Sequence, residues 1–205
     1  MKLPRVFTIS ADGGADALLA EAGRLVREGR LVAFPTETVY GLAADAANPA
    51  AIERLNRVKG RPPEKPYSLH LHDAAQVREF VSTIPPVAQQ LMARFWPGPL
   101  PIVLTGKDGK TVGFRLPQHP IAQAFLRACG RAVAAPSANR SGFAPPTDAK
   151  EVLAALGGDC DAVIDNGPTP LGRESTVVQV LGDHLEILRE GALSADDVRA
   201  ALHAA

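Results

Sequence analysis

The chain alternates throughout between short apolar runs and longer amphipathic segments, and this alternation limits the folds it can adopt. Apolar runs closed by turn-forming residues are too short for helices and predict buried strands. They occur at residues 31–34, 102–104, 112–116, 132–135, 162–164, 176–180 and 185–188, and the alternating segment at residues 67–71 also predicts a strand. Apolar residues at helical spacing predict helices at residues 15–29, 49–58, 77–81, 86–95, 120–130 and 148–157, and from residue 194 onward. Because several strands follow one another directly, we expect a mixed, twisted α/β sheet flanked by helices rather than a strictly doubly wound one.

Several element boundaries carry a specific chemical signal. Asn48 followed by Pro49 is typical of an N-cap with proline in the first helical turn. Residues 96–99 (WPGP) must end the helix before them, because proline cannot continue a helix. Asp148, with Glu151 three residues later, resembles a capping box.

Charge balance and cysteine usage restrict the classes of protein to which the chain can belong. The 205 residues include 22 Lys and Arg and 22 Asp and Glu, so the formal net charge is zero. Nucleic-acid-binding proteins normally carry a basic excess, so we do not expect nucleic acid to be the main partner. No run approaches the ~20 apolar residues that span a bilayer, and residues 1–5 lack the features of a signal peptide. Cys129 and Cys160 fit no metal-binding pattern, which favours reduced thiols in a cytoplasmic protein, with one structural disulfide as the alternative.

Five loops carry more polar and backbone-shaping residues than packing requires. Three of them are residues 35–41 (PTETVYG), 135–142 (APSANRSG) and 172–176 (GREST), the last followed by 189–191 (REG). The first comes directly after a predicted buried strand, where open α/β sheets place ligands, although a plain turn with capping threonines is the alternative. Small residues in the second allow a ligand to approach the backbone closely.

The other two loops carry cations. Lys59 and Arg61 flank one glycine, so they can present an ammonium and a guanidinium to one polyphosphate, and a solvated charge run is the alternative. Arg115 lies in an otherwise apolar strand, where an unpaired guanidinium is costly, so we expect it to meet an anion from the protein or from a ligand. His70 lies on the strand face opposite its leucine neighbours, where a structural histidine is the common case. No Walker A or Rossmann glycine motif occurs, so a nucleotide site here is not one of the commonest types.

Taken together, these loops resemble the YrdC-like family, the threonylcarbamoyl-AMP synthases. The segments VAFPTETVYGLAADA, KGRP, WPGPLPIVL, TVGFRLPQHP, APSANRSG, GRESTVV and ILREG match in the family's order and span residues 32–191. The resemblance implies a twisted α/β sheet around a large, concave, positively lined cavity. It also implies a nucleotidyltransferase that makes threonylcarbamoyl-AMP and pyrophosphate from L-threonine, bicarbonate and ATP, with Mg²⁺ on the phosphates. A downstream transferase would then attach the threonylcarbamoyl group to tRNA.

The resemblance assigns expected roles to individual residues. Lys59 and Arg61 would be the catalytic cations, acting by positioning and by neutralising phosphate charge. L-Threonine would be held by Thr36, His70, Arg115 and Ser175, with Arg115 taking the carboxylate. No metal-ligating residues are implied. The ATP site would comprise Lys59, Arg61, Lys65, Thr111, Ala135, Ser137, Asn139 and Arg189.

The chain departs from the commonest family pattern in the loop that follows Lys59. Many members read K-G-R-P-x-x-N-P-L, whereas Lys65 replaces the asparagine and Tyr67-Ser68 replaces the leucine stretch here. Lys65 either adds a third cation to the phosphate site or points to solvent, and mutual repulsion among crowded cations favours solvent.

Domain organisation and an alternative function complete the expectations. No linker divides the chain, so we expect a single domain over residues 1–205, without the additional C-terminal domain of longer members. The YciO-like branch also varies in the Lys65 loop. A relative of that kind with a nucleotide- or RNA-binding role, or with related carbamoyl-adenylate chemistry, is the alternative function. We expect tRNA binding by the isolated protein to be weak.

Overall fold

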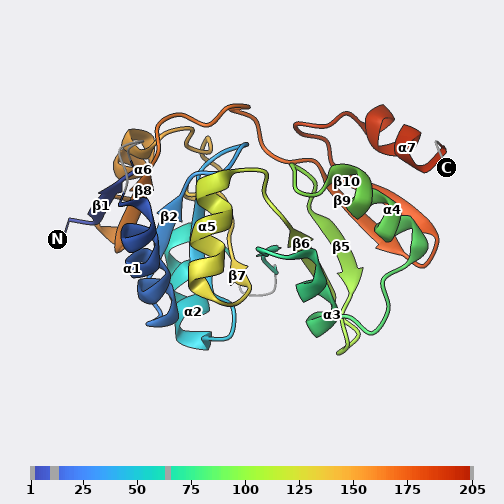
Figure 1. Cartoon of the computed structure of the whole chain (residues 1–205), viewed down its shortest axis with the longest axis horizontal. Coiled ribbons are helices and arrows are strands. Elements are labelled where there is room, and N and C mark those ends of the chain that lie inside the picture. Colours follow the sequence, from blue (N-terminus) through green and yellow to red (C-terminus); the bar gives the residue numbers. More distant parts are fainter. Residues whose placement is uncertain (1–2, 10–13, 63–65, 204–205) are drawn as a thin grey trace.

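The strands form one mixed sheet, and helices pack on both of its faces (Figure 1). The computed structural model describes residues 3–9, 14–62 and 66–203. The strands in these residues are β1 (Arg5–Thr8), β2 (Val32–Phe34), β3 (Gly41–Asp45), β4 (Leu69–His70), β5 (Ile102–Thr105), β6 (Thr111–Arg115), β7 (Val133–Ala134), β8 (Ala162–Asp165), β9 (Val177–Leu181) and β10 (His184–Arg189). The helices are α1 (Ala15–Arg27), α2 (Pro49–Lys59), α3 (Val77–Phe80), α4 (Pro86–Phe95), α5 (Pro120–Cys129), α6 (Ala149–Leu156) and α7 (Ala195–His203), with 3-10 turns at Ala74–Gln76 and Gly157–Asp159.

The strand order and directions confirm a mixed sheet. Within the described residues the order is β1-β8-β2-β3-β7-β4-β6-β5-β9-β10. Parallel pairs such as β1–β8, β4–β6 and β5–β9 occur beside antiparallel pairs such as β2–β3 and β9–β10. The sheet therefore joins segments from both ends of the chain, so that strands distant in sequence lie beside each other.

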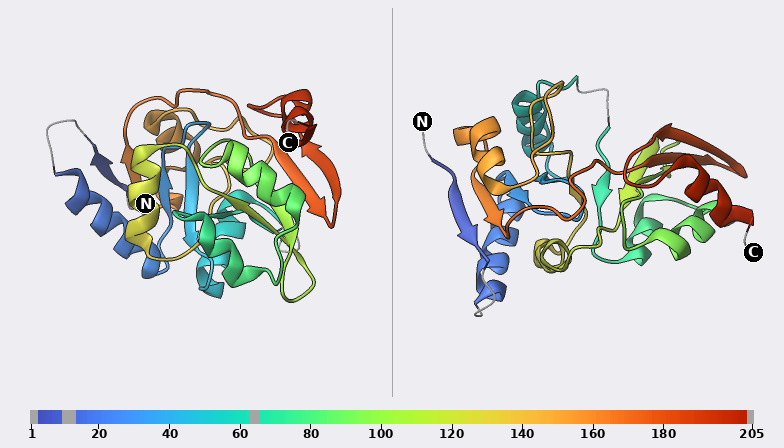
Figure 2. Two further views of the ribbon diagram at one scale, coloured as in Figure 1. Left: turned by 45° about the vertical axis from the view of Figure 1, so that its right-hand side comes forward. Right: turned by 90° about the horizontal axis from the view of Figure 1, so that it is seen from above.

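Helices cover both faces of the first half of the sheet, which consists of β1, β8, β2, β3 and β7. Figure 2 shows α1 and α5 on one side of these strands and α2 and α6 on the other. Successive side chains of a strand point to opposite faces, so Val32 and Phe34 pack with α1 and α5. Leu31 and Ala33 pack instead into the core that contains residues of α2 and α6. This is why the run at 31–34 is apolar at every position.

The structure also corrects the predicted elements in places. It adds β1 and β3, which the sequence pattern does not predict, and it shortens the strands predicted at residues 67–71 and 132–135. The side chain of Asp148 accepts a hydrogen bond from the amide of Glu151 at 2.7 Å, as predicted. The Glu151 carboxylate, however, accepts from the amide and hydroxyl of Thr147, so the capping box is not reciprocal.

The cysteines and helices bear on two further expectations. Cys129 and Cys160 are buried free thiols. Burial raises the pKa of Cys129 to about 12 and that of Cys160 to about 11, which keeps both thiols protonated. None of the described helices combines the length and apolar composition that crossing a bilayer requires.

Candidate functional site

The second half of the sheet has one face in the core and one face open to a cavity. Ile102, Phe114 and Val178 point into the core, where residues of α3 and α4 pack. Their neighbours on the opposite face line a cavity of about 830 Å³. Strand alternation therefore builds the floor of the cavity. The floor positions in β5, β6 and β9 are Val103, Thr111, Gly113, Arg115, Val177 and Gln179.

The cavity brings together nearly all of the predicted site residues. Residues from the segments 59–61, 66–70, 135–145 and 174–175 line the cavity together with the sheet face. Thr36 is not among the lining residues. Lys65 lies outside the described residues, so its predicted contact is untested. The predicted residues that line the cavity are Lys59, Arg61, His70, Thr111, Arg115, Ala135, Ser137, Asn139, Ser175 and Arg189.

Lys59 is the last residue of α2 and lies buried at the cavity wall, with an exposed fraction of 4%. Its Nζ donates to the carbonyl oxygen of Ser137 at 2.5 Å, to the carbonyl oxygen of Asn139, and to Asn139 Oδ1 at 3.2 Å. An ammonium has three donors, so this loop accounts for all of them. Burial, followed by the nearby Arg61 charge, lowers the pKa of Lys59 to about 8. Lys59 thus fixes the 135–142 loop as well as carrying charge into the cavity.

Arg61 lies on the stretch after α2 and packs on an aromatic ring. Its Nη2 donates to the carbonyl oxygen of Pro66 at 2.9 Å, and its guanidinium carbon lies 4.9 Å from the centroid of the Tyr67 ring. The Tyr67 hydroxyl donates to Asn56 Oδ1 at 2.7 Å. The cation–π contact and these hydrogen bonds hold this part of the cavity wall against α2.

Arg189 connects β10 to the GREST loop. Its Nη1 lies 2.7 Å from Glu174 Oε1, and its Nε and Nη2 donate to the carbonyl oxygen of Ser175 at 3.2 and 2.9 Å. Glu174 is the one carboxylate among the described residues that line this cavity. Arg189 pairs with it, so much of the local charge is compensated within the protein.

A buried polar network lies behind Arg115. Its Nη2 lies 2.9 Å from both Glu37 Oε1 and Thr38 Oγ1, and Nη2 donates a hydrogen bond to the hydroxyl. The prediction that Arg115 meets an anion is confirmed, and that anion is the carboxylate of Glu37. Thr36 Oγ1 donates to the Val39 carbonyl oxygen at 2.7 Å, so the 2.9 Å contact between the two threonine hydroxyls has Thr38 as its donor. Thr36 therefore supports Thr38 from behind, away from the cavity.

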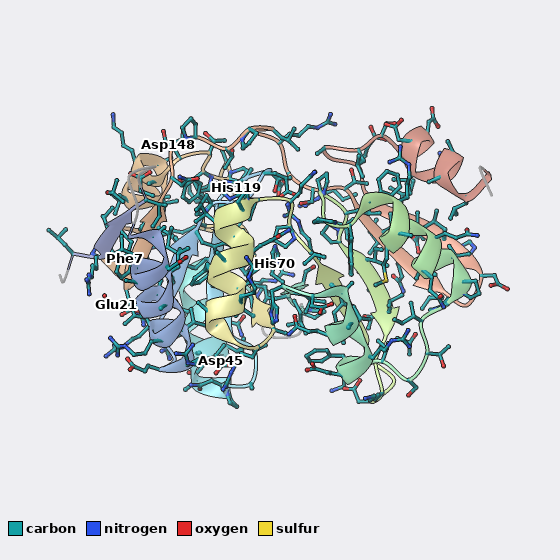
Figure 3. The ribbon with its side chains drawn as sticks, viewed as in Figure 1. Phe7, Glu21, Asp45, His70, His119 and Asp148 are labelled. Carbon is teal, nitrogen blue, oxygen red and sulfur yellow. The ribbon has the colours of Figure 1, made fainter. Side chains whose placement is uncertain are left out.

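His70 is a buried neutral imidazole at the cavity wall. Burial, followed by the Arg115 charge, lowers its pKa to about 3. Within the described residues, its Nδ1 has no hydrogen-bond partner. Its ring meets the Phe34 ring edge-on at a centroid distance of 6.0 Å. Figure 3 shows His70 between the two halves of the sheet and His119 at the beginning of α5. His70 therefore contributes a neutral ring, rather than a charge, to the cavity wall.

Sequence reasoning missed several cavity residues. Val103, Val177 and Gln179 lie on strands that were read only as buried runs. Strand alternation in the sequence identifies the two faces, but the open face follows from how the sheet twists and which helices cover it. Phe143 lines the cavity mouth with 72% of its surface exposed, and a lone loop aromatic gives no sequence signal of that position.

The donor set bears on the metal expected with ATP. The described residues contain no cluster of three or more His, Cys, Asp or Glu side chains that could hold a metal ion. Among the described lining residues, the one carboxylate, Glu174, is paired with Arg189. The described groups do not fit a protein-held Mg²⁺ site, so Mg²⁺ would enter the cavity bound to phosphate oxygens.

Comparison with known proteins decides the family. A family model named Sua5/YciO/YrdC and described as telomere recombination matches residues 24–191. The chain belongs to the Sua5/YciO/YrdC family. The threonylcarbamoyl-AMP synthase of Bacillus subtilis is 40% identical to this Sua5/YciO/YrdC chain, over 98% of this chain and 62% of its own length.

Two solved structures place this Sua5/YciO/YrdC chain among its structural relatives. Pyrococcus abyssi Sua5 complexed with L-threonine is similar at a TM-score of 0.90 and 35% identity, covering 98% of this chain and 61% of that one. Escherichia coli YciO is similar at a TM-score of 0.81 and 27% identity, covering 92% and 96% respectively. The chain spans between 49% and 62% of the first three curated relatives it matches. These structures have the same twisted mixed α/β fold as this chain.

Proposed function

We propose that the protein is a threonylcarbamoyl-AMP synthase, which converts L-threonine, bicarbonate and ATP into threonylcarbamoyl-AMP and pyrophosphate. The observation that carries the proposal is that one cavity is lined both by seven of the eight residues expected to bind ATP and by three of the four expected to bind L-threonine. A reaction between two substrates needs such shared space, because their reacting atoms must meet.

The proposed chemistry needs no covalent intermediate on the protein. The amine of L-threonine and bicarbonate form a carbamate with loss of water. A carbamate oxygen then attacks the α-phosphorus of ATP as the bond to pyrophosphate breaks. Lys59, Arg61 and Arg189 line the cavity and would neutralise the phosphate charge that develops in this step. Mg²⁺, bound through ATP, would supply further charge neutralisation.

The structure also bears on how individual residues would act. Three carbonyl-type oxygens accept hydrogen bonds from Lys59 Nζ. Direct contact between Nζ and phosphate therefore requires one of these oxygens to be replaced by a phosphate oxygen. Lys59 and Arg61 as catalytic cations, and Arg115 as the group that binds the threonine carboxylate, remain part of this proposal. Thr36 would act indirectly, by supporting Thr38.

A second candidate function rests on the likeness to Escherichia coli YciO, whose structure is similar at a TM-score of 0.81 and 27% identity. A nucleotide- or RNA-binding protein without threonine-dependent chemistry would keep the same cavity. The two candidates differ in whether ATP is consumed only when L-threonine is present.

Pyrophosphate release tests the proposal. The purified protein is given ATP and Mg²⁺, with and without L-threonine and bicarbonate, and the adenylate product is identified by mass spectrometry. We expect pyrophosphate release only with all three substrates. Release that ignores L-threonine, or nucleotide binding without turnover, would support the second candidate. If threonylcarbamoyl-AMP is the product, a downstream tRNA-modifying transferase would consume it.

A further inference from the structure

Glu37 is a buried carboxylate that faces a cavity-lining arginine from behind. It lies in the loop between β2 and β3, with an exposed fraction of 5%, and it is not among the residues lining the cavity. One of its oxygens lies 2.9 Å from Arg115 Nη2. Within the described residues, neither oxygen has a hydrogen-bond partner of good geometry. Burying an ionised carboxylate with so few partners is costly, so its presence calls for a reason beyond packing.

Two other elements contribute charged or titratable groups that face Glu37. Arg115 comes from β6, and His119 comes from the start of α5. Burial lowers the pKa of His119, and the Glu37 charge opposes that shift. His119 Nδ1 accepts a long hydrogen bond of 3.4 Å from the Ala122 amide, so this ring caps α5. Arg115 is therefore the fixed cation that compensates Glu37.

Two nitrogen atoms of the Arg115 guanidinium contact acceptors within the described residues, and the third does not. Its Nη2 is shared by Glu37 and Thr38, and its Nε lies 3.4 Å from the carbonyl oxygen of Gly98. Nothing in the described part of the chain accepts a hydrogen bond from Nη1. Because Arg115 lines the cavity, Nη1 is the nitrogen left to meet a ligand.

We propose that Glu37 is a positioning residue of the amino-acid site, that is, the part of the cavity at His70, Arg115 and Ser175 expected to hold L-threonine. Glu37 holds the Arg115 guanidinium so that Nη1 is presented to a substrate carboxylate. The inference rests on the proposed function and adds to it a residue that never touches the substrate. Thr38 offers one neutral acceptor, whereas Glu37 offers a full negative charge, and charge-assisted contacts are the stronger ones.

The main chain of Glu37 connects it to a second part of the amino-acid site. Its carbonyl oxygen accepts a hydrogen bond from the Leu171 amide at 2.9 Å. Leu171 begins the stretch that leads to Ser175, another residue expected to hold L-threonine. The loop of Glu37 thus aligns two sides of the same subsite.

Glu37→Gln tests this proposal, because it removes the charge and nearly keeps the shape. We expect the dissociation constant for L-threonine, measured by calorimetry on the full chain with ATP analogue present, to rise about tenfold, the scale of one charge-assisted contact. The dissociation constant for the ATP analogue should stay within about twofold. In an Arg115→Leu background, Glu37→Gln should weaken L-threonine binding no further, because the residue through which it acts is gone.

Asp45→Asn is the matched control. Asp45 is also buried, its Oδ2 lies 3.0 Å from Arg131 Nη1, and neither residue lines the cavity. Asp45→Asn should lower the unfolding temperature, as Glu37→Gln should, and leave L-threonine affinity unchanged. If Asp45→Asn and Glu37→Gln weaken L-threonine binding equally, Glu37 acts only through stability and the proposal is wrong.

A ligand-independent measurement separates this proposal from the proposed function. The Nε–H signal of Arg115, assigned by its loss in Arg115→Leu, should be sharp in the ligand-free parent and broadened in Glu37→Gln. An unchanged signal overturns the proposal whatever the protein binds. A parent that binds no L-threonine contradicts the proposed function, and the signal still decides the role of Glu37. If Glu37→Gln does not fold, Glu37→Asp keeps the charge on a shorter side chain and should show a smaller effect of the same sign.

Discussion

The ammonium group of Lys59 both donates hydrogen bonds to the 135–142 loop and carries positive charge into the cavity, and both properties depend on its protonation. Its folded-state pKa of about 8 lies below the ordinary value of 10.5, because burial disfavours the ammonium. Between these two values the unfolded chain binds more protons than the folded one, so stability should rise as the pH rises from about 8 to about 10.5. ATP binding should show the opposite trend, because phosphate favours the ammonium.

We therefore expect ATP affinity to fall as the pH rises through about 8, while the free energy of unfolding increases. Calorimetric titration with ATP analogue and denaturant unfolding between pH 7 and pH 10 measure the two quantities. Lys59→Met should abolish both pH dependences. An ATP affinity that stays level until pH 10 would mean that Lys59 carries no charge relevant to phosphate.

The residues of the amino-acid site also show which features the sequence predicts and which depend on the folded loop. An arginine in an apolar strand predicts an anion, and Arg115 has one in Glu37. Thr36 is expected to hold L-threonine, and in the structure its hydroxyl forms hydrogen bonds with Val39 and Thr38. Which of several neighbouring polar residues faces a cavity depends on backbone torsions in the loop, and a list of residue types does not contain them.

Helix α2 positions Lys59, so its cap should matter to the cavity. Asn48 Oδ1 accepts hydrogen bonds from the amides of Ala50 and Ala51 at 3.1 and 3.3 Å. Asn48→Ala should lower the free energy of unfolding by about 1 kcal/mol, the usual loss for an N-cap. Chemical denaturation measures this loss. Asn48→Asp keeps the acceptor and should retain most of the stability, and equal losses in both variants would contradict the capping role.

Gly191 allows β10 to approach the GREST loop more closely than any other residue type would. A Cβ atom there would lie 2.3 Å from the Glu174 carbonyl oxygen and 2.5 Å from the Ser175 carbonyl carbon and oxygen. These are backbone atoms, so the loop itself would have to move. Gly191→Ala should cost about 1–3 kcal/mol and weaken ATP binding through displacement of Arg189.

Gly106→Ala is the milder comparison for that variant. Its nearest contact would be a side-chain oxygen at 3.0 Å, in the turn between β5 and β6. We expect a smaller loss of stability and unchanged ATP affinity, measured by the same denaturation and calorimetry. Equal behaviour of the two variants would show that the close approach at Gly191 has no special consequence.

Elements with local chemical signals were predictable, and elements that depend on distant partners were not. Asn48-Pro49 marks the start of α2, and the WPGP segment ends α4. Strand β3 reads GLAAD, whose small residues carry no strand preference, and it forms because β2 and β7 lie on either side of it. Tertiary pairing, rather than local preference, makes it a strand.

The neutral charge of the whole molecule governs how it meets nucleic acid. With 22 basic and 22 acidic residues, the protein has no net attraction for a polyanion. We expect tRNA to bind with a dissociation constant no tighter than about 10⁻⁶ M at physiological salt, and to weaken steeply as salt is added. Fluorescence anisotropy with labelled tRNA, compared with a single-stranded DNA of similar length, measures both. Tight binding that distinguishes the two nucleic acids would contradict this expectation.

The division of strand faces in β5, β6 and β9 has a consequence for how such a protein can diverge. Phe114 and Val178 support the fold, while Val177 and Gln179, on either side of Val178, meet whatever occupies the cavity. Mutations at such cavity-facing positions leave the core packing intact, so selection can explore new ligands without first paying in stability. Mutational tolerance along these strands should thus alternate with a period of two. Lineages descended from one ancestor can then keep the same scaffold while their chemistry drifts apart.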